Sequence, residues 1–262
     1  GESLVTLPAA YVEPPLDGVA LVTGAGRGIG AAIAEALAAR GLTVAVNFRS
    51  DEKAAEAVAA RATKAGGAAK TFRQDCGAAA GAGKLFEAVE KAFGRVDVVV
   101  HNAAPGVDSK PLAQTTAEDL RHQLSASVEA GLELARRAAP GMKSRGFGRL
   151  VFIGSSASLG TPPSGWTAYV TAKAALHGLT RSLAVELGPD GVTANLVSPS
   201  LVPTDLWKGL TENQLRAMAL RSPTRRLTLA EDVARTVCFL AGPGGSQING
   251  ADIPVTGGEV MR

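Results

Sequence analysis

The sequence predicts one α/β domain, a doubly wound parallel sheet of about seven strands with helices on both faces. The candidate strands are continuous apolar runs rich in β-branched residues, such as residues 96–100, and runs of this kind are typical of strands buried on both faces. They alternate along the chain with segments of helical apolar period. The chain has 262 residues, of which 46% are hydrophobic, so it is long enough to bury one large core.

The first strand-helix unit covers residues 19–40. Its apolar run at residues 19–23 predicts a buried strand, a glycine-rich turn follows, and the apolar period after the turn predicts a helix to about residue 40. The same alternation continues to the end of the chain. In order, it predicts a strand near 42–47, a helix at 51–65, a strand at 69–73, a helix at 83–93, a strand at 96–100, a helix at 116–139, a strand at 149–153, a helix at 168–187, a strand at 192–197, a helix at 230–241 and a strand at 252–255.

Sheets of this kind bind ligands at the carboxyl ends of their strands, where the strand order reverses. Four segments follow predicted strands closely enough to lie at that edge. They are residues 24–30, 101–106, 154–158 and 198–206.

Residues 16–262 are expected to form this single domain, and residues 1–15, with three prolines and no helical period, a partly ordered leader. The leader lacks a signal-peptide pattern, and no apolar run approaches the roughly 18 to 20 residues of a membrane helix. Two cysteines are too few for a disulfide framework or a four-ligand zinc site, which favours a reducing cytoplasmic setting and no metal. A net charge of +3 disfavours nucleic acid but is compatible with an anionic cofactor or an acidic carrier protein.

The glycine-rich turn after the first strand predicts a dinucleotide site, because it lies between a strand and a helix. Gly24 permits the turn, and Gly28 and Gly30 let the backbone approach the cofactor and the helix pack on the sheet. The N-terminus of the helix offers free N–H groups to a pyrophosphate. The candidate binding residues are Gly24, Arg27, Gly28, Ile29 and Gly30.

The end of the second strand indicates which nucleotide is bound. Residues 44–50 contain no carboxylate that could accept a ribose 2′-hydroxyl, but they offer Arg49 and Ser50, and Arg27 adds a second cation. Two guanidinium groups suit a 2′-phosphate, which favours NADPH over NADH; the alternative is a pair of solvated surface arginines. Asp75, after the third strand, could accept from the adenine amino group or cap the next turn.

Tyr169 and Lys173 are four residues apart in a predicted helix, so their side chains share one face. A positive charge beside a phenol stabilises phenolate, which predicts a tyrosine whose pKa is lowered toward working pH and which acts as a general acid. An ordinary amphipathic helix is the alternative. The nucleotide turn upstream favours the catalytic interpretation.

Taken together, these motifs resemble the short-chain dehydrogenase/reductase family, most closely its 3-oxoacyl-carrier-protein-reductase-like branch. The resemblance runs from about residue 19 to the end. It includes the glycine turn at 23–30, a form of the family's NNAG segment at 101–104, a serine strand, the YxxxK motif and Val255-Thr256-Gly257-Gly258. It implies a Rossmann-like fold and hydride transfer between a nicotinamide and a carbonyl or alcohol carbon.

The resemblance also implies roles for single residues. Tyr169 looks like the acid that protonates the carbonyl oxygen, and Lys173 like the residue that holds the nicotinamide ribose. Ser156 looks like the orienting serine because it lies thirteen residues before Tyr169, the usual family interval, whereas Ser155 and Ser158 are assigned to the turn. Thr204 matches a threonine that contacts the nicotinamide carboxamide. The remaining cofactor positions implied are Asn102, Ala103 and Pro199.

Three segments depart from the family pattern. Ser127 stands where the family has an asparagine that supports a water chain to the tyrosine, so the proton relay is expected to be altered. His101 replaces the first asparagine of the NNAG segment, and a structural role is favoured over a titrating one. Ser200 follows Pro199 where a glycine is common, and Pro199 still rigidifies the turn.

Residues 200–226 form an irregular-to-helical insertion beside the predicted nicotinamide. Its apolar members predict a lid over an acyl, aromatic or polyketide-like carbonyl substrate, while a helix packed on the surface is the alternative. The apolar lid residues are Leu201, Leu206, Trp207, Leu210 and Met218. Trp166 is expected to form the wall opposite the lid or only to fix its own loop.

Three cations, Lys143, Arg145 and Arg149, are expected to form an edge near the mouth, either docking a carrier protein or coenzyme A or only solvating the surface. The family also implies a homotetramer that pairs the helices at 116–139 and 168–187 through small residues. These small residues are Ala126, Ala130, Gly131, Ala172 and Ala175.

The leading hypothesis is an NADPH-dependent ketoreductase acting on a 3-oxoacyl thioester or polyketide-like carbonyl. Two alternatives are a secondary-metabolism enzyme for cyclic or aromatic ketones and a low-activity NADP-binding regulatory homologue.

Overall fold

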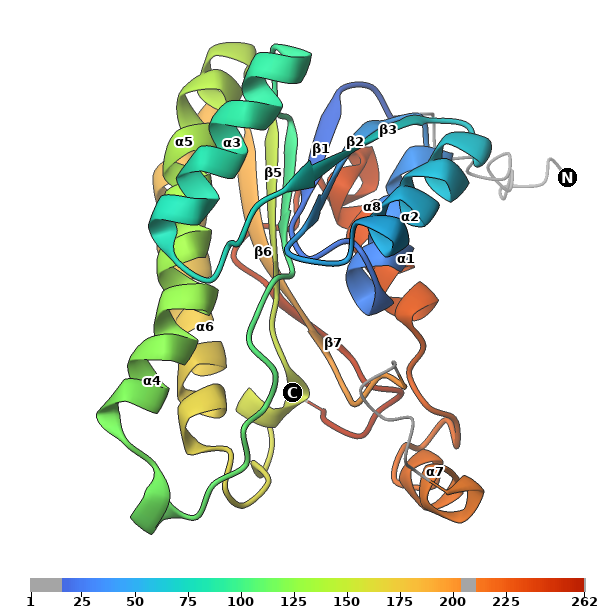
Figure 1. Cartoon of the computed structure of the whole chain (residues 1–262), viewed down its shortest axis with the longest axis vertical. Helices are drawn as coiled ribbons and strands as arrows, with labels where there is room; N and C mark the ends of the chain where they lie inside the picture. Colours follow the sequence, from blue (N-terminus) through green and yellow to red (C-terminus); the bar gives the residue numbers. More distant parts are fainter. Residues whose placement is uncertain (1–15, 204–210, 262) are drawn as a thin grey trace, which may run out of the picture.

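The computed structural model describes residues 16–203 and 211–261, which form one parallel seven-stranded sheet with helices on both faces (Figure 1). The strand order is β3-β2-β1-β4-β5-β6-β7, and every neighbouring pair is parallel. The predicted fold class is therefore confirmed. The leader at residues 1–15 and the lid residues Thr204, Leu206, Trp207 and Leu210 lie outside the described residues.

All seven predicted strands are present within two residues of their expected bounds. The continuous apolar runs explain this, because side chains on both faces of each strand are covered by helices. The strands are β1 (Val19–Val22), β2 (Thr43–Phe48), β3 (Ala68–Arg73), β4 (Val98–His101), β5 (Gly148–Ile153), β6 (Val192–Pro199) and β7 (Asp252–Val255).

The helices differ from prediction in two places. The expected helix at 83–93 begins earlier, at Ala79, and the expected helix at 116–139 is divided by a π-helical turn at residues 125–129 and continues past Pro140 to Arg145. The buried side chain of Met142 packs on β5 and holds this last turn, so packing overrides the proline. The helices are α1 (Gly28–Ala39), α2 (Glu52–Lys64), α3 (Ala79–Phe93), α4 (Ala117–Leu124), α5 (Ala130–Arg145), α6 (Thr167–Leu187), α7 (Glu212–Ala219) and α8 (Ala230–Ala241).

The core has two halves, one on each face of the sheet. Helices α1, α2 and α8 cover one face, and α3, α5 and α6 cover the other (Figure 1). Successive residues of β1 alternate between the halves, Ala20 and Val22 facing one and Val19 and Leu21 the other. The strand order reverses between β1 and β4, which places the ligand crevice at the carboxyl ends of these two strands.

The expected cationic edge near the mouth is wrong. Arg149 is the second residue of β5, so it lies at the amino end of the strands, opposite the crevice. It is buried and stacks on the Phe147 ring at 4.3 Å, while Arg145 pairs with buried Asp97 at 2.9 Å and Lys143 pairs with Asp190 at 3.0 Å. These cations therefore serve the base of the fold.

The small residues expected at a subunit interface are mostly buried within the chain itself. Ala126, Ala130, Gly131 and Ala172 are all buried, and Gly131 packs closely against Phe152 and His101. Their size therefore allows close packing within this subunit. Among the described residues, no helix combines the length and the apolar character that crossing a membrane requires.

Candidate active site

A cleft of about 1290 Å³ opens at the carboxyl ends of the strands. All four segments predicted for this edge contribute to its lining: the glycine turn, the loop after β4, the turn after β5 and the loop after β6. Among the predicted residues that line it are Arg27, Gly28, Ile29, Asn102, Ala103, Ser156, Tyr169, Lys173 and Pro199.

The glycine turn has little room for side chains. Gly24 adopts a left-handed φ of +61°, and a Cβ at Gly30 would lie 2.3 Å from the carbonyl oxygen of Gly24. Gly30 is buried and does not line the cleft, so it serves the close approach of α1 to the turn. Asn102 closes the turn, since its Nδ2 donates to the carbonyl oxygens of Thr23 and Gly24, each at 3.1 Å.

Asn47 also holds this turn, although sequence reasoning gave it no role. Its Oδ1 accepts from Gly24 N at 3.0 Å, and its Nδ2 donates to the carbonyl oxygens of Phe72 at 3.2 Å and Gln74 at 3.0 Å. The side chain is 2% exposed. The signal in the sequence is an amide inside an otherwise apolar strand, because a buried amide requires partners.

The cations proposed for a 2′-phosphate face the cleft. Arg27, Arg49 and Ser50 are exposed and line it, and Lys84 of α3, which sequence reasoning missed, lines it too. Asp75 also lines the cleft, and its Oδ1 accepts from Gly77 N at 2.8 Å. Asp75 therefore caps the turn after β3, as one of the two alternatives predicts. A contact between Asp75 and the adenine amino group stays a prediction.

Tyr169 and Lys173 share one face of α6, as their spacing predicts. The Lys173 Nζ lies 5.7 Å from the centre of the Tyr169 ring and donates to the carbonyl oxygen of Ile153 at 2.8 Å. Burial lowers the pKa of Lys173 to about 8. For the phenol the expected direction is wrong: burial raises the pKa of Tyr169, and a hydrogen bond with Ser155 opposes that rise. Desolvation therefore outweighs any stabilisation of phenolate by the ammonium.

The residue that meets the phenol is Ser155, not Ser156. Ser155 is 8% exposed, and its side chain hydrogen-bonds with Tyr169 and accepts from Ala157 N at 3.2 Å. Ser156 begins the short 3₁₀ turn after β5 and is half-buried. The interval of thirteen residues thus selected the wrong one of two adjacent serines, because a turn can accommodate one extra residue between the strand and the helix.

Ser127 lies in the π-helical turn between α4 and α5. It is 1% exposed, and its Oγ has no hydrogen-bond partner among the residues that the structure describes. Ser127 does not line the cleft, although its neighbour Ala126 does. A buried hydroxyl of this kind is a typical partner for an internal water.

His101 has the structural role that the sequence favours. Its Nδ1 lies 3.1 Å from Thr23 Oγ1, and its Nε2 lies 3.0 Å from the Ala126 carbonyl oxygen. Burial, together with the charge of Lys173, lowers the pKa of His101 to about 4, so the ring is neutral near neutral pH. Since a carbonyl only accepts, Nε2 carries the proton, and the ring links the π-helical turn to the glycine turn.

The apolar side of the cleft adjoins Tyr169. Trp166 packs against Tyr169 edge to face, with ring centres 5.6 Å apart. Leu201 and Met218, two of the predicted lid residues, line the cleft. No residue of α7 is buried, which argues against the alternative of a helix packed on the domain surface.

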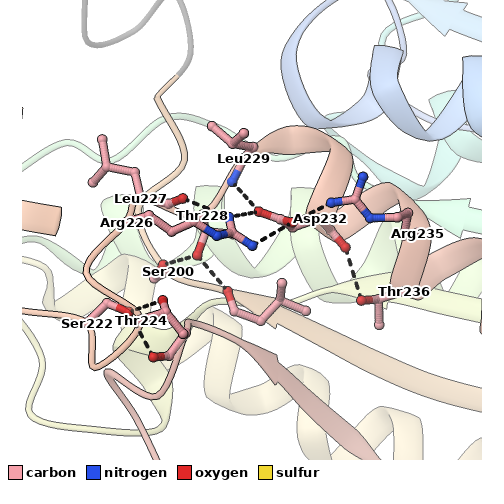
Figure 2. Close-up of polar contacts among 12 residues, drawn as sticks. Ser200, Ser222, Thr224, Arg226, Leu227, Thr228, Leu229, Asp232, Arg235 and Thr236 are labelled. Atoms are coloured by element: carbon pink, nitrogen blue, oxygen red, sulfur yellow. Dashed lines mark hydrogen bonds and ion pairs between the residues drawn. The ribbon is translucent and has the colours of Figure 1, made fainter.

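The base of the lid is tied to β7 and α8 by a polar cluster (Figure 2). Thr228 Oγ1 lies 2.7 Å from Ser200 Oγ and donates to the Val255 carbonyl oxygen at 3.1 Å. Asp232 accepts from Arg226 and Arg235, and the bond from Arg226 holds the pKa of this carboxyl well below its usual range. These contacts fix where the segment leaves the domain.

Comparison with known proteins places the chain among reductases. The family model described as enoyl-(acyl carrier protein) reductase matches residues 24–259. Hydroxynaphthalene reductase arp2 of Aspergillus fumigatus is 36% identical over 255 residues, which is 90% of each chain.

Two solved structures are similar over almost their whole length. One is the promiscuous reductase LugOII, described as catalysing keto-reduction at C1 during lugdunomycin biosynthesis, with a TM-score of 0.86, 33% identity and coverage of 93% of this chain and 98% of that one. The other is a 3-oxoacyl (acyl-carrier-protein) reductase from Agrobacterium tumefaciens C58 with NADP bound, with a TM-score of 0.85, 34% identity and coverage of 91% and 93%.

Proposed function

Because the chain belongs to the short-chain dehydrogenase/reductase family and is an NADP-dependent oxidoreductase, we propose that it reduces a cyclic or aromatic ketone of the polyketide type to an alcohol. The observation that carries the proposal is the apolar wall beside the general acid, where Trp166 packs on Tyr169 in the same cleft as Met218 and Leu201. The indole of Trp166 beside the general acid, in a cleft with further apolar side chains, favours a planar ring system.

The residues of the cleft fit NADP(H). Gly24, Gly26 and Gly28 of the glycine turn line the cleft without side chains, which lets the backbone approach a pyrophosphate. Arg27 and Arg49 face the cleft, and the end of β2 has no carboxylate that would reject a 2′-phosphate. When bound, NADPH supplies the hydride.

The chain itself supplies the proton. Because burial raises the pKa of Tyr169, its phenol stays protonated at neutral pH, which is the form that a general acid requires. We assign to Tyr169 the donation of a proton to the carbonyl oxygen of the substrate, and to Ser155 the orientation of the Tyr169 phenol. Lys173, fixed on the Ile153 carbonyl, places a charge beside the phenol that stabilises the phenolate left after the transfer.

A second candidate substrate is a 3-oxoacyl thioester. It is supported by the similarity to a 3-oxoacyl (acyl-carrier-protein) reductase and by the size of the cleft, which leaves room for an extended acyl chain. The cations expected to dock a carrier lie at the other end of the sheet, so this candidate lacks the docking edge that the sequence suggested.

The experiment follows NADPH oxidation with hydroxylated naphthalenones, tetralones and acetoacetyl thioesters, with NADH in parallel, for the wild type and Tyr169→Phe. We expect NADPH-dependent turnover of the bicyclic ketones that is lost in Tyr169→Phe, while NADPH binding is retained. Preferential turnover of the thioester would favour the second candidate. Tight NADPH binding without turnover of any compound would argue against the proposal.

The homotetramer and the cytoplasmic setting also stand as proposals. Leu132 of α5 and Val185 of α6 are 46% and 80% exposed, which supports a subunit interface at these two helices. Light scattering on the protein as it elutes from a size-exclusion column would measure the number of subunits. Both cysteines are buried, which is compatible with a reducing compartment.

A further inference from the structure

A chain of polar contacts leads from β7 through α6 to the turn that carries Ser155. The Ser158 Oγ donates to the carbonyl oxygen of Ser155 at 2.8 Å and lies 3.2 Å from the Nε2 of His177. On its other side, the His177 Nδ1 lies 3.2 Å from the Oδ2 of Asp252, the first residue of β7. None of these three side chains has a role in the proposed reaction.

The direction of these contacts follows from counting protons. A carbonyl oxygen only accepts, so the single hydroxyl proton of Ser158 is used on Ser155. The Ser158 oxygen can then only accept from His177, which places a proton on Nε2. The carboxylate of Asp252 also only accepts, so its place 3.2 Å from Nδ1 calls for a proton on that nitrogen too, and the ring that satisfies both contacts is the imidazolium.

His177 continues the catalytic face of α6. It follows Lys173 by four residues, just as Lys173 follows Tyr169, so the three side chains lie on one side of the helix. The turn after β5 is therefore attached to this face at both ends. Ser155 meets Tyr169 at one end, and Ser158 meets His177 at the other.

We propose that His177, oriented by Asp252, is a positioning residue that acts through Ser158 to hold Ser155 against the phenol of Tyr169. The role in catalysis rests on the proposed function, but the positioning itself does not. The neighbouring Lys173 makes a separate contact, since its Nζ donates to the carbonyl of Ile153, just before the turn.

Two amide variants separate positioning from simple packing. The amide nitrogen of His177→Gln matches the place of Nε2 and can still reach Ser158, whereas that of His177→Asn matches Nδ1 and can reach only Asp252. The chain has two tyrosines, so a Tyr11→Phe background makes Tyr169 the only one. The ¹³C resonance of a labelled Tyr169 ring carbon then reports its hydrogen bond without any substrate, and Ser155→Ala supplies the reference for losing it.

We expect His177→Asn to move the Tyr169 resonance in the same direction as Ser155→Ala, and the double variant to move it no further. His177→Gln should resemble the parent. In turnover of the best ketone, His177→Asn should lower kcat by up to about 100-fold with little change in NADPH affinity, and His177→Gln should recover most of it. Ser158→Ala removes the same link without touching the helix and should repeat the pattern.

An unchanged resonance in both His177→Asn and Ser158→Ala, with a clear shift in Ser155→Ala, would overturn the proposal. Equal effects of the asparagine and glutamine variants would overturn it as well, since that result indicates a packing role. If the wild type reduces no ketone, the proposed function fails, while the resonances still decide whether His177 positions Ser155.

Discussion

The ammonium of Lys173 is hydrogen-bonded to the carbonyl oxygen of Ile153, at the carboxyl end of β5 and directly beneath the turn that carries Ser155. This contact fixes a buried cation, 5% exposed, beside the proton donor Tyr169. Burial is also what lowers the pKa of Lys173 to about 8, from an ordinary value of 10.5. The cost of this arrangement should be measurable in the stability of the protein.

Lys173→Met should alter how stability depends on pH. Below about pH 8 both the folded and the unfolded chain bind the Lys173 proton, and the folded chain bears the cost of burying it. Between about pH 8 and 10.5 the unfolded chain binds a proton that the folded chain lacks, so this group makes the free energy of unfolding rise with pH. The wild type should gain roughly 3 kcal/mol relative to Lys173→Met across that window, measured by urea unfolding. Parallel curves for the two proteins would contradict this.

Ser155→Ala and Ser156→Ala should differ sharply although the residues are adjacent. Of the two serines, Ser155 is the one that hydrogen-bonds with Tyr169, so Ser155→Ala should lower kcat on the order of 100-fold, as loss of one oriented donor commonly does. Ser156→Ala should change kcat little. Steady-state kinetics of ketone reduction measures both, and a large loss in Ser156→Ala alone would restore the assignment from spacing.

Ser127→Ala should separate activity from stability. The Oγ is buried and has no hydrogen-bond partner in the described part of the chain, so removing it should change the free energy of unfolding by less than about 1 kcal/mol. If the hydroxyl holds a water that reprotonates Tyr169, kcat should fall on the order of 100-fold. Thermal unfolding and turnover should be compared on the same preparations; a full kcat in Ser127→Ala would exclude the relay.

The sequence predicts the sheet well because burial on both faces leaves a strong local pattern. All seven strands, the glycine turn and the shared face of Tyr169 and Lys173 follow from runs and spacings within a few residues. The weaker signals belong to small residues: residues 79–83 consist of alanine and glycine, so the start of α3 has no amphipathic pattern to mark it.

The parts of the site that sequence reasoning missed depend on contacts between distant segments. Ser155 and Ser156 are chemically identical, and only the path of the turn decides which one meets Tyr169. The direction of the tyrosine pKa depends on how deeply the phenol is buried, which spacing does not reveal. Arg149 lies away from the mouth because it is the second residue of β5, and the residue type alone does not show at which end of the sheet a charge lies.

Arg49→Glu should shift cofactor preference from NADPH toward NADH. Arg49 is exposed, lines the cleft and follows β2, where the ribose of the cofactor is expected. Replacing a charge-assisted donor by a carboxylate should raise the Kd of NADPH on the order of 100-fold and leave that of NADH nearly unchanged. Arg73→Glu, the same change on an exposed arginine outside the cleft lining, is the control. Equal weakening in both variants would indicate only a general effect of charge, and cofactor fluorescence measures the affinity of each protein for each cofactor.

Asn47→Asp should both destabilise the fold and weaken cofactor binding. The amide nitrogen of Asn47 donates to the carbonyls of Phe72 and Gln74, and a carboxylate oxygen in its place would face those carbonyls buried and unpaired. The free energy of unfolding should fall by about 3 kcal/mol.

The matched control for Asn47→Asp is Asn195→Asp on β6. Asn195 is equally buried, donates to the Ile248 carbonyl at 2.7 Å and accepts from Ala251 N at 3.0 Å, but it does not line the cleft. Both variants should lose similar stability in urea unfolding, yet only Asn47→Asp should raise the Kd of NADPH, by about tenfold, because of these two asparagines Asn47 is the one that bonds to the glycine turn at Gly24. An equal loss of NADPH affinity in the two variants would mean that Asn47 supports the fold without positioning the cofactor turn.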